Sequence, residues 1–203
     1  NVLLAADVII PENAIGVVLF AHGSGSSRHS PRNQFVASAL NSAGIATVLA
    51  DLLTAKEELV DERTAEFRFN SPLLTTRMIH IIDWAETSEK LSRLPIGLFG
   101  ASTGAAAALD AAAARPELVR AVVSRGGRVD LADNLGRVRA ASLFIAGERD
   151  TLVLQLNENA LPQLAGVKKI EVIAGATHLF EEKGALEQVA QLAAKWFARY
   201  LEV

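Results

Sequence analysis

The most informative stretch of the sequence is residues 96–104, which read IGLFGASTG. Its first four residues are apolar and predict a buried strand, and residues 102–115 continue as an alanine-rich helix that ends at Pro116. Between strand and helix lies the pattern G-x-S-x-G. Glycine on each side of Ser102 permits a turn that is too tight for bulkier neighbours and exposes the serine hydroxyl. The same pattern also occurs as a structural turn with an incidental serine.

Short apolar runs alternate with helical patterns along the rest of the chain. Strands buried on both faces form continuous apolar runs, whereas helices place apolar residues at a period of 3.6. This alternation predicts α/β architecture, with one mostly parallel central sheet covered by helices on both faces, in a single domain spanning residues 1–203. The predicted strands are residues 7–10 (at an edge), 15–21, 45–49, 96–99, 118–123, 141–146 and 169–173, and the predicted helices are residues 31–43, 73–91, 102–115, 152–164 and 186–200. The charged residues 56–70 predict a short helix followed by a surface loop.

Composition limits the classes of function. Half of the residues are hydrophobic and 21% are charged, as in a well-packed globular protein. The net charge of −3 argues against a nucleic-acid partner. The chain has no cysteine, which excludes disulfides, thiolate metal sites and a cysteine nucleophile. Because no His/Asp/Glu cluster has metal-ligand spacing, we expect no metal and no cofactor.

The sequence also leads to expectations about where the protein is located and how it assembles. Residues 1–10 lack the basic and apolar regions of a signal peptide, and no apolar run approaches the roughly 18 residues that span a bilayer. We therefore expect a cytoplasmic protein without a membrane partner, and a homodimer is left open.

Polar residues directly follow several of the predicted strands. In open α/β sheets, sites form beyond the carboxyl ends of the strands. A serine nucleophile needs a base and an acid that orients the base, here in the chain order Ser, Asp, His. His178 is the last of the four histidines and follows the strand 169–173, so it is the predicted base. Asp150 is the predicted acid; it could instead cap the next helix, and Asp130 is an alternative acid.

A hydrolytic site also needs N–H donors for the oxyanion. One is expected from Thr103, directly after the nucleophile, and the other from residues 22–27, HGSGSS, here called the 22–27 loop. We expect the second donor to be the N–H of Ser24, with Gly23 as its neighbour. A Gly/Ser-rich loop before a helix could instead bind phosphate, but this one lacks the lysine of a P-loop.

Four motifs in this order resemble the capless, dienelactone-hydrolase-like group of the α/β-hydrolase superfamily. The resemblance implies an α/β-hydrolase fold without a cap domain, an open site, and hydrolysis of small, short-acyl or anionic esters or lactones. Dienelactone hydrolases proper use a cysteine nucleophile, whereas Ser102 stands at that position here. The motifs are His22-Gly23-Ser24-Gly25, Gly100-Ala101-Ser102-Thr103-Gly104, Gly147-Glu148-Arg149-Asp150 and Gly175-Ala176-Thr177-His178.

Substrate selection is expected to involve Gly23, Arg28 and Arg125. Relatives that the chain resembles often hold a substrate carboxylate with arginine, whose planar fork suits it. The alternative is that these arginines are solvated surface residues, as most charged side chains are. A thioesterase, amidase or acyltransferase would use the same triad, and a hydrolase scaffold can also serve as a non-enzymatic binding protein.

Overall fold

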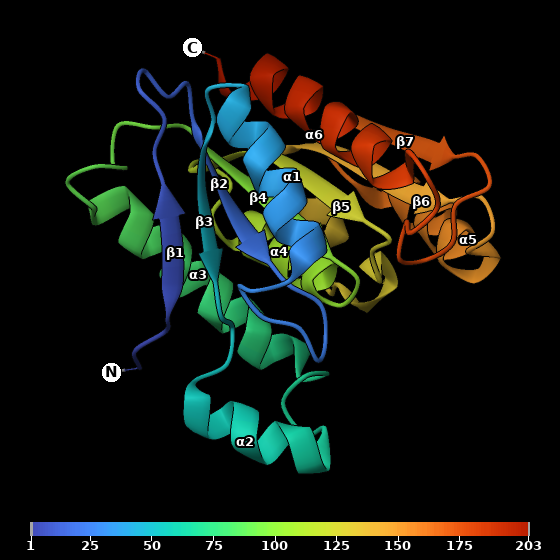
Figure 1. Ribbon diagram of the computed structural model, residues 1–203, viewed down its shortest axis with the longest axis horizontal. Coiled ribbons are helices and arrows are strands. Elements are labelled where there is room, and N and C mark those ends of the chain that lie inside the picture. The colour runs from blue at the N-terminus through green and yellow to red at the C-terminus, as the bar shows by residue number, and fades with distance from the viewer. Residues whose placement is uncertain (1, 203) are drawn as a thin grey trace.

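The computed structural model describes residues 2–202, in which a twisted sheet lies between two layers of helices (Figure 1). Its seven strands follow the order β1-β3-β2-β4-β5-β6-β7, and β1 alone runs antiparallel to its neighbour. The mostly parallel sheet predicted from the apolar runs is therefore confirmed. The strands are β1 (Ala6–Ile9), β2 (Val17–Ala21), β3 (Ala46–Ala50), β4 (Ile96–Ala101), β5 (Val119–Arg125), β6 (Ala141–Gly147) and β7 (Lys168–Ile173).

Helices cover both faces of this sheet. α1 and α6 pack beside each other on one face, where their apolar side chains meet Val18, Phe20 and Phe99 of the central strands. α3 and α4 cover the opposite face. The alanines of α4 are buried almost throughout, which allows this helix to lie close to the sheet. The α-helices are α1 (Pro31–Ser42), α2 (Ala55–Thr64), α3 (Ser71–Thr87), α4 (Gly104–Ala114), α5 (Thr151–Ala160) and α6 (Ala185–Leu201).

Three predicted helices are clearly shorter than expected. α5 ends at Ala160 rather than at residue 164 and is followed by a 3-10 turn over Leu161–Gln163. α3 ends at Thr87 rather than at residue 91, and the chain then turns through Ser88 in an extended conformation. Leu91, which continues the helical period, reaches the core from that turn and is buried. α4 begins at Gly104 rather than at Ser102, because Ser102 itself lies in the turn.

The 56–70 segment forms the predicted helix and loop. Thr54 caps α2 and makes a reciprocal capping box with Glu57. Buried Asp61 then organises the following loop by accepting hydrogen bonds from the backbone N–H groups of Phe67 and Arg68 and from the Arg68 guanidinium. Burial alone would raise the pKa of Asp61, but these bonds outweigh it and lower the pKa. Phe67 packs against the core, whereas Phe69 is exposed.

Candidate active site

Ser102 lies at the sharp turn between β4 and α4. Its φ of 49° is in the left-handed region, which residues other than glycine rarely adopt. A Cβ atom added at Gly100 would lie 2.4 Å from Cα of Ala105, and one added at Gly104 would lie 2.3 Å from the carbonyl oxygen of Ala21. Neither position has room for a side chain. The turn therefore has the close packing that the G-x-S-x-G pattern predicts.

Backbone hydrogen bonds hold Ser102 in this conformation. Its N–H donates to the carbonyl oxygen of Arg125 (3.2 Å), and its carbonyl oxygen accepts from Ala105 (3.1 Å) and Arg128 (3.0 Å). Strained conformations persist where the surroundings determine them in this way. The hydroxyl is half-buried and makes no hydrogen bond within residues 2–202, so it is free to meet a ligand.

Asp150 and His178 lie on adjacent loops, after β6 and β7. Nδ1 of His178 donates to Oδ2 of Asp150 across 2.6 Å, a short distance that fits a hydrogen bond to a charged carboxylate. Asp150 occupies the N-cap position of α5, yet its side chain makes no cap hydrogen bond. The carboxylate is directed at the imidazole instead. This geometry favours the role of an orienting acid over that of a helix cap.

The alternative acid, Asp130, has a different partner. Both of its carboxylate oxygens accept from the guanidinium of Arg128, at 2.9 and 2.8 Å. This hydrogen bond lowers the pKa of Asp130. Asp130 therefore forms a local ion pair, and between residues 2 and 202 it makes no hydrogen bond to an imidazole.

Backbone contacts connect the two loops that carry the acid and the base. The N–H of Arg149 donates to the carbonyl oxygen of Ala176 (2.9 Å), and the N–H of Gly175 donates to the carboxylate of Glu148 (2.6 Å). Both bonds lie beside the Asp150–His178 pair. The relative position of acid and base is thus set by neighbouring residues as well as by their own hydrogen bond.

Gly126 brings the base loop close to the serine turn. A Cβ atom added at Gly126 would lie 3.5 Å from Cε1 of the His178 ring. Gly126 directly follows Arg125, whose carbonyl oxygen accepts from Ser102. The ring therefore lies beside the backbone that supports Ser102. Hydrogen bonds between nucleophile and base are often long in unliganded enzymes and close when substrate binds.

The 22–27 loop approaches Ser102 from β2. A Cβ atom added at Gly23 would lie 3.1 Å from Cβ of Ser102. The N–H of Ser24, expected as an oxyanion donor, donates to Oγ1 of Thr103 (2.9 Å) and is therefore occupied in this structure. Within residues 2–202, the N–H groups of Gly23 and Thr103 make no hydrogen bond. Thr103 and Gly23 are thus the available donors, and Ser24 becomes one if the threonine side chain turns away.

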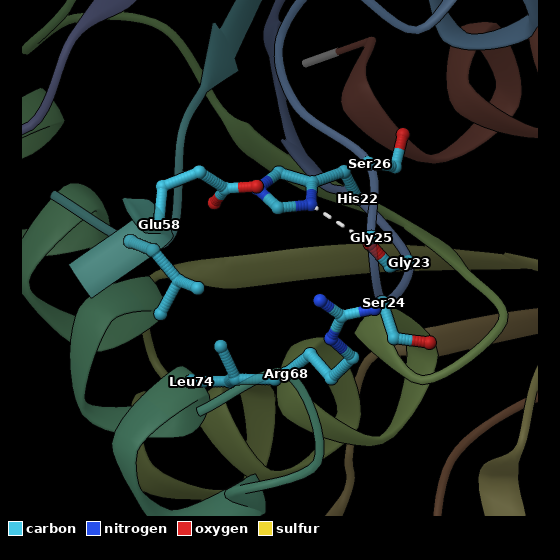
Figure 2. Close-up of a pocket in the computed structure, with 9 residues that line it drawn as sticks. His22, Gly23, Ser24, Gly25, Ser26, Glu58, Arg68 and Leu74 are labelled. Carbon is cyan, nitrogen blue, oxygen red and sulfur yellow. Dashed lines mark hydrogen bonds between the residues drawn. The ribbon is translucent and has the colours of Figure 1, made fainter. Parts of the chain in front are cut away.

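His22 supports this loop, a role that the sequence analysis did not assign. Its Nε2 accepts from the N–H of Leu52 (3.0 Å), so the ring proton lies on Nδ1, which donates to the carbonyl oxygen of Gly23 (3.0 Å; Figure 2). Burial lowers the pKa of His22, which keeps the ring neutral. The sequence feature that indicates this role is the position of His22, directly between a buried strand and Gly23.

A small pocket separates the 22–27 loop from the segment around α2 (Figure 2). The Arg68 guanidinium extends towards the loop, and its Nη1 would lie 3.4 Å from a Cβ atom added at Gly25. The 56–70 segment therefore borders the loop that carries the expected oxyanion donors. The pocket is lined by His22, Gly23, Ser24, Gly25, Ser26, Leu53, Glu58, Arg68 and Leu74.

The two arginines that were expected to bind substrate differ in their contacts. Arg28 donates through its backbone N–H and its guanidinium to the carboxylate of Asp51, and its Nε lies 3.5 Å from Asp7. Two carboxylates of the protein already match its charge, which favours a structural role for Arg28; its role as a substrate ligand stays a prediction. Arg125 is buried, and its Nη1 has no hydrogen-bond partner in the part of the chain that the structure describes.

Within residues 2–202, no group of three or more His, Cys, Asp or Glu side chains could hold a metal ion. In the same part of the chain, no helix is long and apolar enough to cross a membrane.

With this geometry in view, comparison with known proteins identifies the family. The family model described as an alpha/beta hydrolase domain matches residues 14–200. The chain belongs to the α/β-hydrolase family. It resembles dienelactone hydrolase and lacks a cap: a dienelactone hydrolase from Anabaena variabilis is 54% identical, with a TM-score of 0.96 over 97% of this chain and 92% of that one.

Two further comparisons are with a solved structure of the same fold and with a curated relative. Est1E from Butyrivibrio proteoclasticus shares the fold at 17% identity, with a TM-score of 0.80 over 97% of this chain and 93% of that one. A Mycobacterium tuberculosis (strain H37Rv) protein, provisionally named a phosphoribosyl transferase, is 53% identical over 98% of this chain. The match covers 44% of that relative's length. The name therefore describes a protein much longer than this chain.

Proposed function

We propose that this protein is a serine hydrolase that cleaves small carboxylic esters or lactones through an acyl-enzyme on Ser102. The observation that carries the proposal is the 2.6 Å hydrogen bond between His178 and Asp150, on loops beside the strained turn at Ser102. The dienelactone hydrolase name of the Anabaena relative, at 54% identity, supports an ester or lactone substrate.

In the proposed reaction, Oγ of Ser102 attacks the ester carbonyl carbon while Nε2 of His178 accepts the hydroxyl proton. The charged imidazolium is stabilised by Asp150. The N–H of Thr103 and an N–H of the 22–27 loop bind the tetrahedral oxyanion. Collapse of the intermediate breaks the ester C–O bond, and His178 returns the proton to the departing alcohol. Water then attacks the acyl-enzyme while His178 accepts its proton. Collapse of this second intermediate breaks the bond to Oγ of Ser102, which regains a proton from His178 as the acid is released.

The shape of the site favours small substrates. The stretch from β5 to β6 contains two short 3-10 turns, at Val129–Leu131 and Leu135–Arg137, and forms no cap. Ser102 is half-buried and the His178 side chain is 38% exposed. Because few walls surround the nucleophile, we expect long acyl chains to gain little binding energy from burial.

The test is hydrolysis of p-nitrophenyl esters of increasing acyl length by the wild type, Ser102→Ala and the surface control Ser92→Ala. We expect activity to peak at short chains and to fall by at least about 10³-fold in Ser102→Ala alone. The Ser102 hydroxyl makes no hydrogen bond within the described residues, so this variant should melt within about 3 °C of the wild type.

A fluorophosphonate probe provides an independent readout. It should label the wild type and Ser92→Ala but not Ser102→Ala. Labelling without turnover of these esters would point to a more specialised ester. A wild-type protein that neither hydrolyses esters nor labels would instead be a binding protein on a hydrolase scaffold, and the proposal would be wrong.

A further inference from the structure

The loop between β7 and α6 holds His178 in a turn that its own backbone closes. The N–H of Phe180 donates to the carbonyl oxygen of Thr177 (3.2 Å), so His178 is the second residue of a four-residue turn. This turn, residues 177–180, is here called the base turn. Loops are more mobile than the strands they connect, whereas a general base must be held in a fixed position. The contacts of the base turn therefore decide how well His178 is placed.

Phe180 has a backbone conformation that large residues rarely adopt. Its φ of 55° lies in the left-handed region, where a bulky side chain is a genuine outlier. Ser102, the proposed nucleophile, has a similar φ of 49°. Strained residues of this kind persist only where their surroundings determine them, and they are concentrated at functional sites. Two strained residues thus belong to the proposed site, one at the nucleophile and one two positions after the base.

The phenyl ring of Phe180 anchors the base turn in the core. The residue is 1% exposed and belongs to the apolar cluster between α6 and the sheet. Burial of the ring removes a large apolar area from water, which offsets the cost of the left-handed backbone. The His178 side chain is 38% exposed by contrast. The base turn therefore has a buried end that fixes it and an exposed part that carries the imidazole.

The anchor and the base both lie against Gly126. A Cβ atom added at Gly126 would lie 3.4 Å from Cε2 of Phe180, 3.2 Å from the carbonyl oxygen of His178 and 3.5 Å from Cε1 of the imidazole. Gly126 directly follows Arg125, whose carbonyl oxygen accepts from the N–H of Ser102. A continuous series of contacts thus connects the Phe180 ring, through Gly126, to the backbone of the nucleophile.

A second anchor holds the other end of the base turn. The carboxylate of Glu182 accepts from the N–H of Thr177, at 3.1 Å to each oxygen, and from the Thr177 hydroxyl at 2.7 Å. The bond from this hydroxyl is the main reason that the pKa of Glu182 lies below its ordinary value, so the carboxylate is ionised at neutral pH. Thr177 precedes His178 directly. The base is therefore held from both sides along the chain.

We propose that Phe180 is a positioning residue for the reaction, because its buried ring and left-handed backbone place the His178 imidazole relative to Ser102. The inference rests on the proposed function, in which His178 is the base. Asp150 orients the imidazole through a hydrogen bond, whereas Phe180 sets where the imidazole stands. A misplacement of about 1 Å can slow an enzymatic reaction by about 10²-fold, so loss of the ring should lower kcat although Phe180 acts only through the base turn.

The test replaces Phe180 by alanine and by leucine, with Phe197→Ala and Phe197→Leu as matched controls. Phe197 is a fully buried phenylalanine of the same apolar cluster. It packs at Gly97, near the start of β4, whereas Ser102 follows the end of that strand. Both pairs of variants remove the same volume from one core, so we expect similar losses of melting temperature. An effect on stability alone would be shared by both pairs, and an effect on positioning separates them.

The main readout is turnover of a short p-nitrophenyl ester at a temperature at which every variant is folded. For Phe180→Ala we expect kcat to fall about 10- to 100-fold with KM within about threefold of the wild type, because the base acts in the transition state. Phe180→Leu refills part of the volume and should recover part of this loss. Both Phe197 variants should keep kcat within about twofold of the wild type.

Fluorophosphonate labelling gives a second readout. It reports the attack by Ser102 without the later hydrolysis of an acyl-enzyme, so its rate should fall in Phe180→Ala by a factor similar to that of kcat. In Phe197→Ala the labelling rate should match that of the wild type. A fall in kcat without a fall in the labelling rate would contradict a role in placing the base for attack.

The remaining outcomes separate the two proposals. A Phe180→Ala enzyme whose kcat stays within about threefold of that of Phe197→Ala would overturn the positioning role and leave the serine hydrolase intact. If Phe180→Ala does not fold, Phe180→Leu decides the question, and a kcat equal to that of Phe197→Leu would overturn the inference. A wild type that neither hydrolyses esters nor labels would overturn the proposed function and this inference together.

Discussion

Replacing Asp150 by asparagine removes the charge that faces His178 and leaves the shape of the side chain nearly unchanged. When His178 accepts the Ser102 proton, it becomes a cation beside a carboxylate oxygen 2.6 Å from Nδ1. Two unit charges about 4 Å apart at an effective dielectric constant of about 20 interact by about 4 kcal/mol. The His178 side chain is 38% exposed, so screening by water reduces this to about 3 kcal/mol, or roughly 150-fold in rate.

Loss of tautomer control adds to this electrostatic effect. An amide can offer the imidazole either an oxygen or an N–H, so the ring is no longer held with its proton on Nδ1. The corresponding substitution in the chymotrypsin-type triad costs about 10⁴-fold in kcat. For Asp150→Asn we therefore expect kcat on a short p-nitrophenyl ester to fall between about 10²- and 10⁴-fold, with a melting temperature within about 3 °C of the wild type.

Asp130→Asn is the matched control, because Asp130 is the other acid that the sequence allows. Its partner is the half-exposed Arg128, and surface pairs of this kind contribute about 0–1 kcal/mol. We expect its kcat to stay within about twofold of the wild type. An Asp150→Asn enzyme that keeps more than a tenth of the activity, or an Asp130→Asn enzyme that loses as much as Asp150→Asn, would refute this assignment of the acid.

Three further substitutions test the close packing at the serine turn and the buried carboxylate of α2. Gly104→Ala places a Cβ atom 2.3 Å from a backbone oxygen and should cost about 3 kcal/mol or more, whereas Gly44→Ala, with φ of +74° and nothing within 4 Å, should cost about 1–2 kcal/mol. Thermal melts should rank them in that order, and a Gly104→Ala protein that melts within about 2 °C of the wild type would contradict the close approach. Asp61→Asn should lower the free energy of unfolding by about 2–4 kcal/mol at pH 7, because Asp61 is buried and accepts several hydrogen bonds. The folded-state pKa of Asp61 is lowered, so this stabilisation is present above about pH 4 and is lost as the pH falls through the folded pKa; an equal difference in urea unfolding at pH 7 and pH 3 would argue against it.

The fold could be predicted because its five central strands, β2 to β6, are buried almost throughout. β2 is apolar at every position and β3 at every position except Thr47, and each was located to within two residues by its composition alone. The error at α3 has a physical cause: Leu91 has the spacing of a helical residue, but it fills the core from a turn. Periodicity reports which side chains are buried, and a turn can bury a side chain as well as a helix can.

The sequence could predict those parts of the site that follow from the order of the strands and of the residues after them. Asp150 and His178 follow neighbouring strands, and parallel strands bring such residues together. Whether the N–H of Ser24 is available to an oxyanion depends on the rotamer of Thr103, and no sequence pattern specifies that rotamer. Arg28 and Arg125 look equivalent in the sequence, but Asp51 follows β3 and pairs with the first, whereas Nη1 of the second has no hydrogen-bond partner among the described residues.

The groups proposed for catalysis are separate from the contacts that hold the loops together. His22 joins β3 to the 22–27 loop, Arg149 joins the acid loop to the base loop, and the backbone of Arg125 supports Ser102. These bonds use backbone atoms or a neutral ring. A left-handed residue costs about 1–3 kcal/mol, and the bonds to the Ser102 backbone offset that cost without involving its hydroxyl. The reactive side chain can therefore be replaced while the strained turn persists, which is why loss of activity at Ser102 should occur without loss of fold.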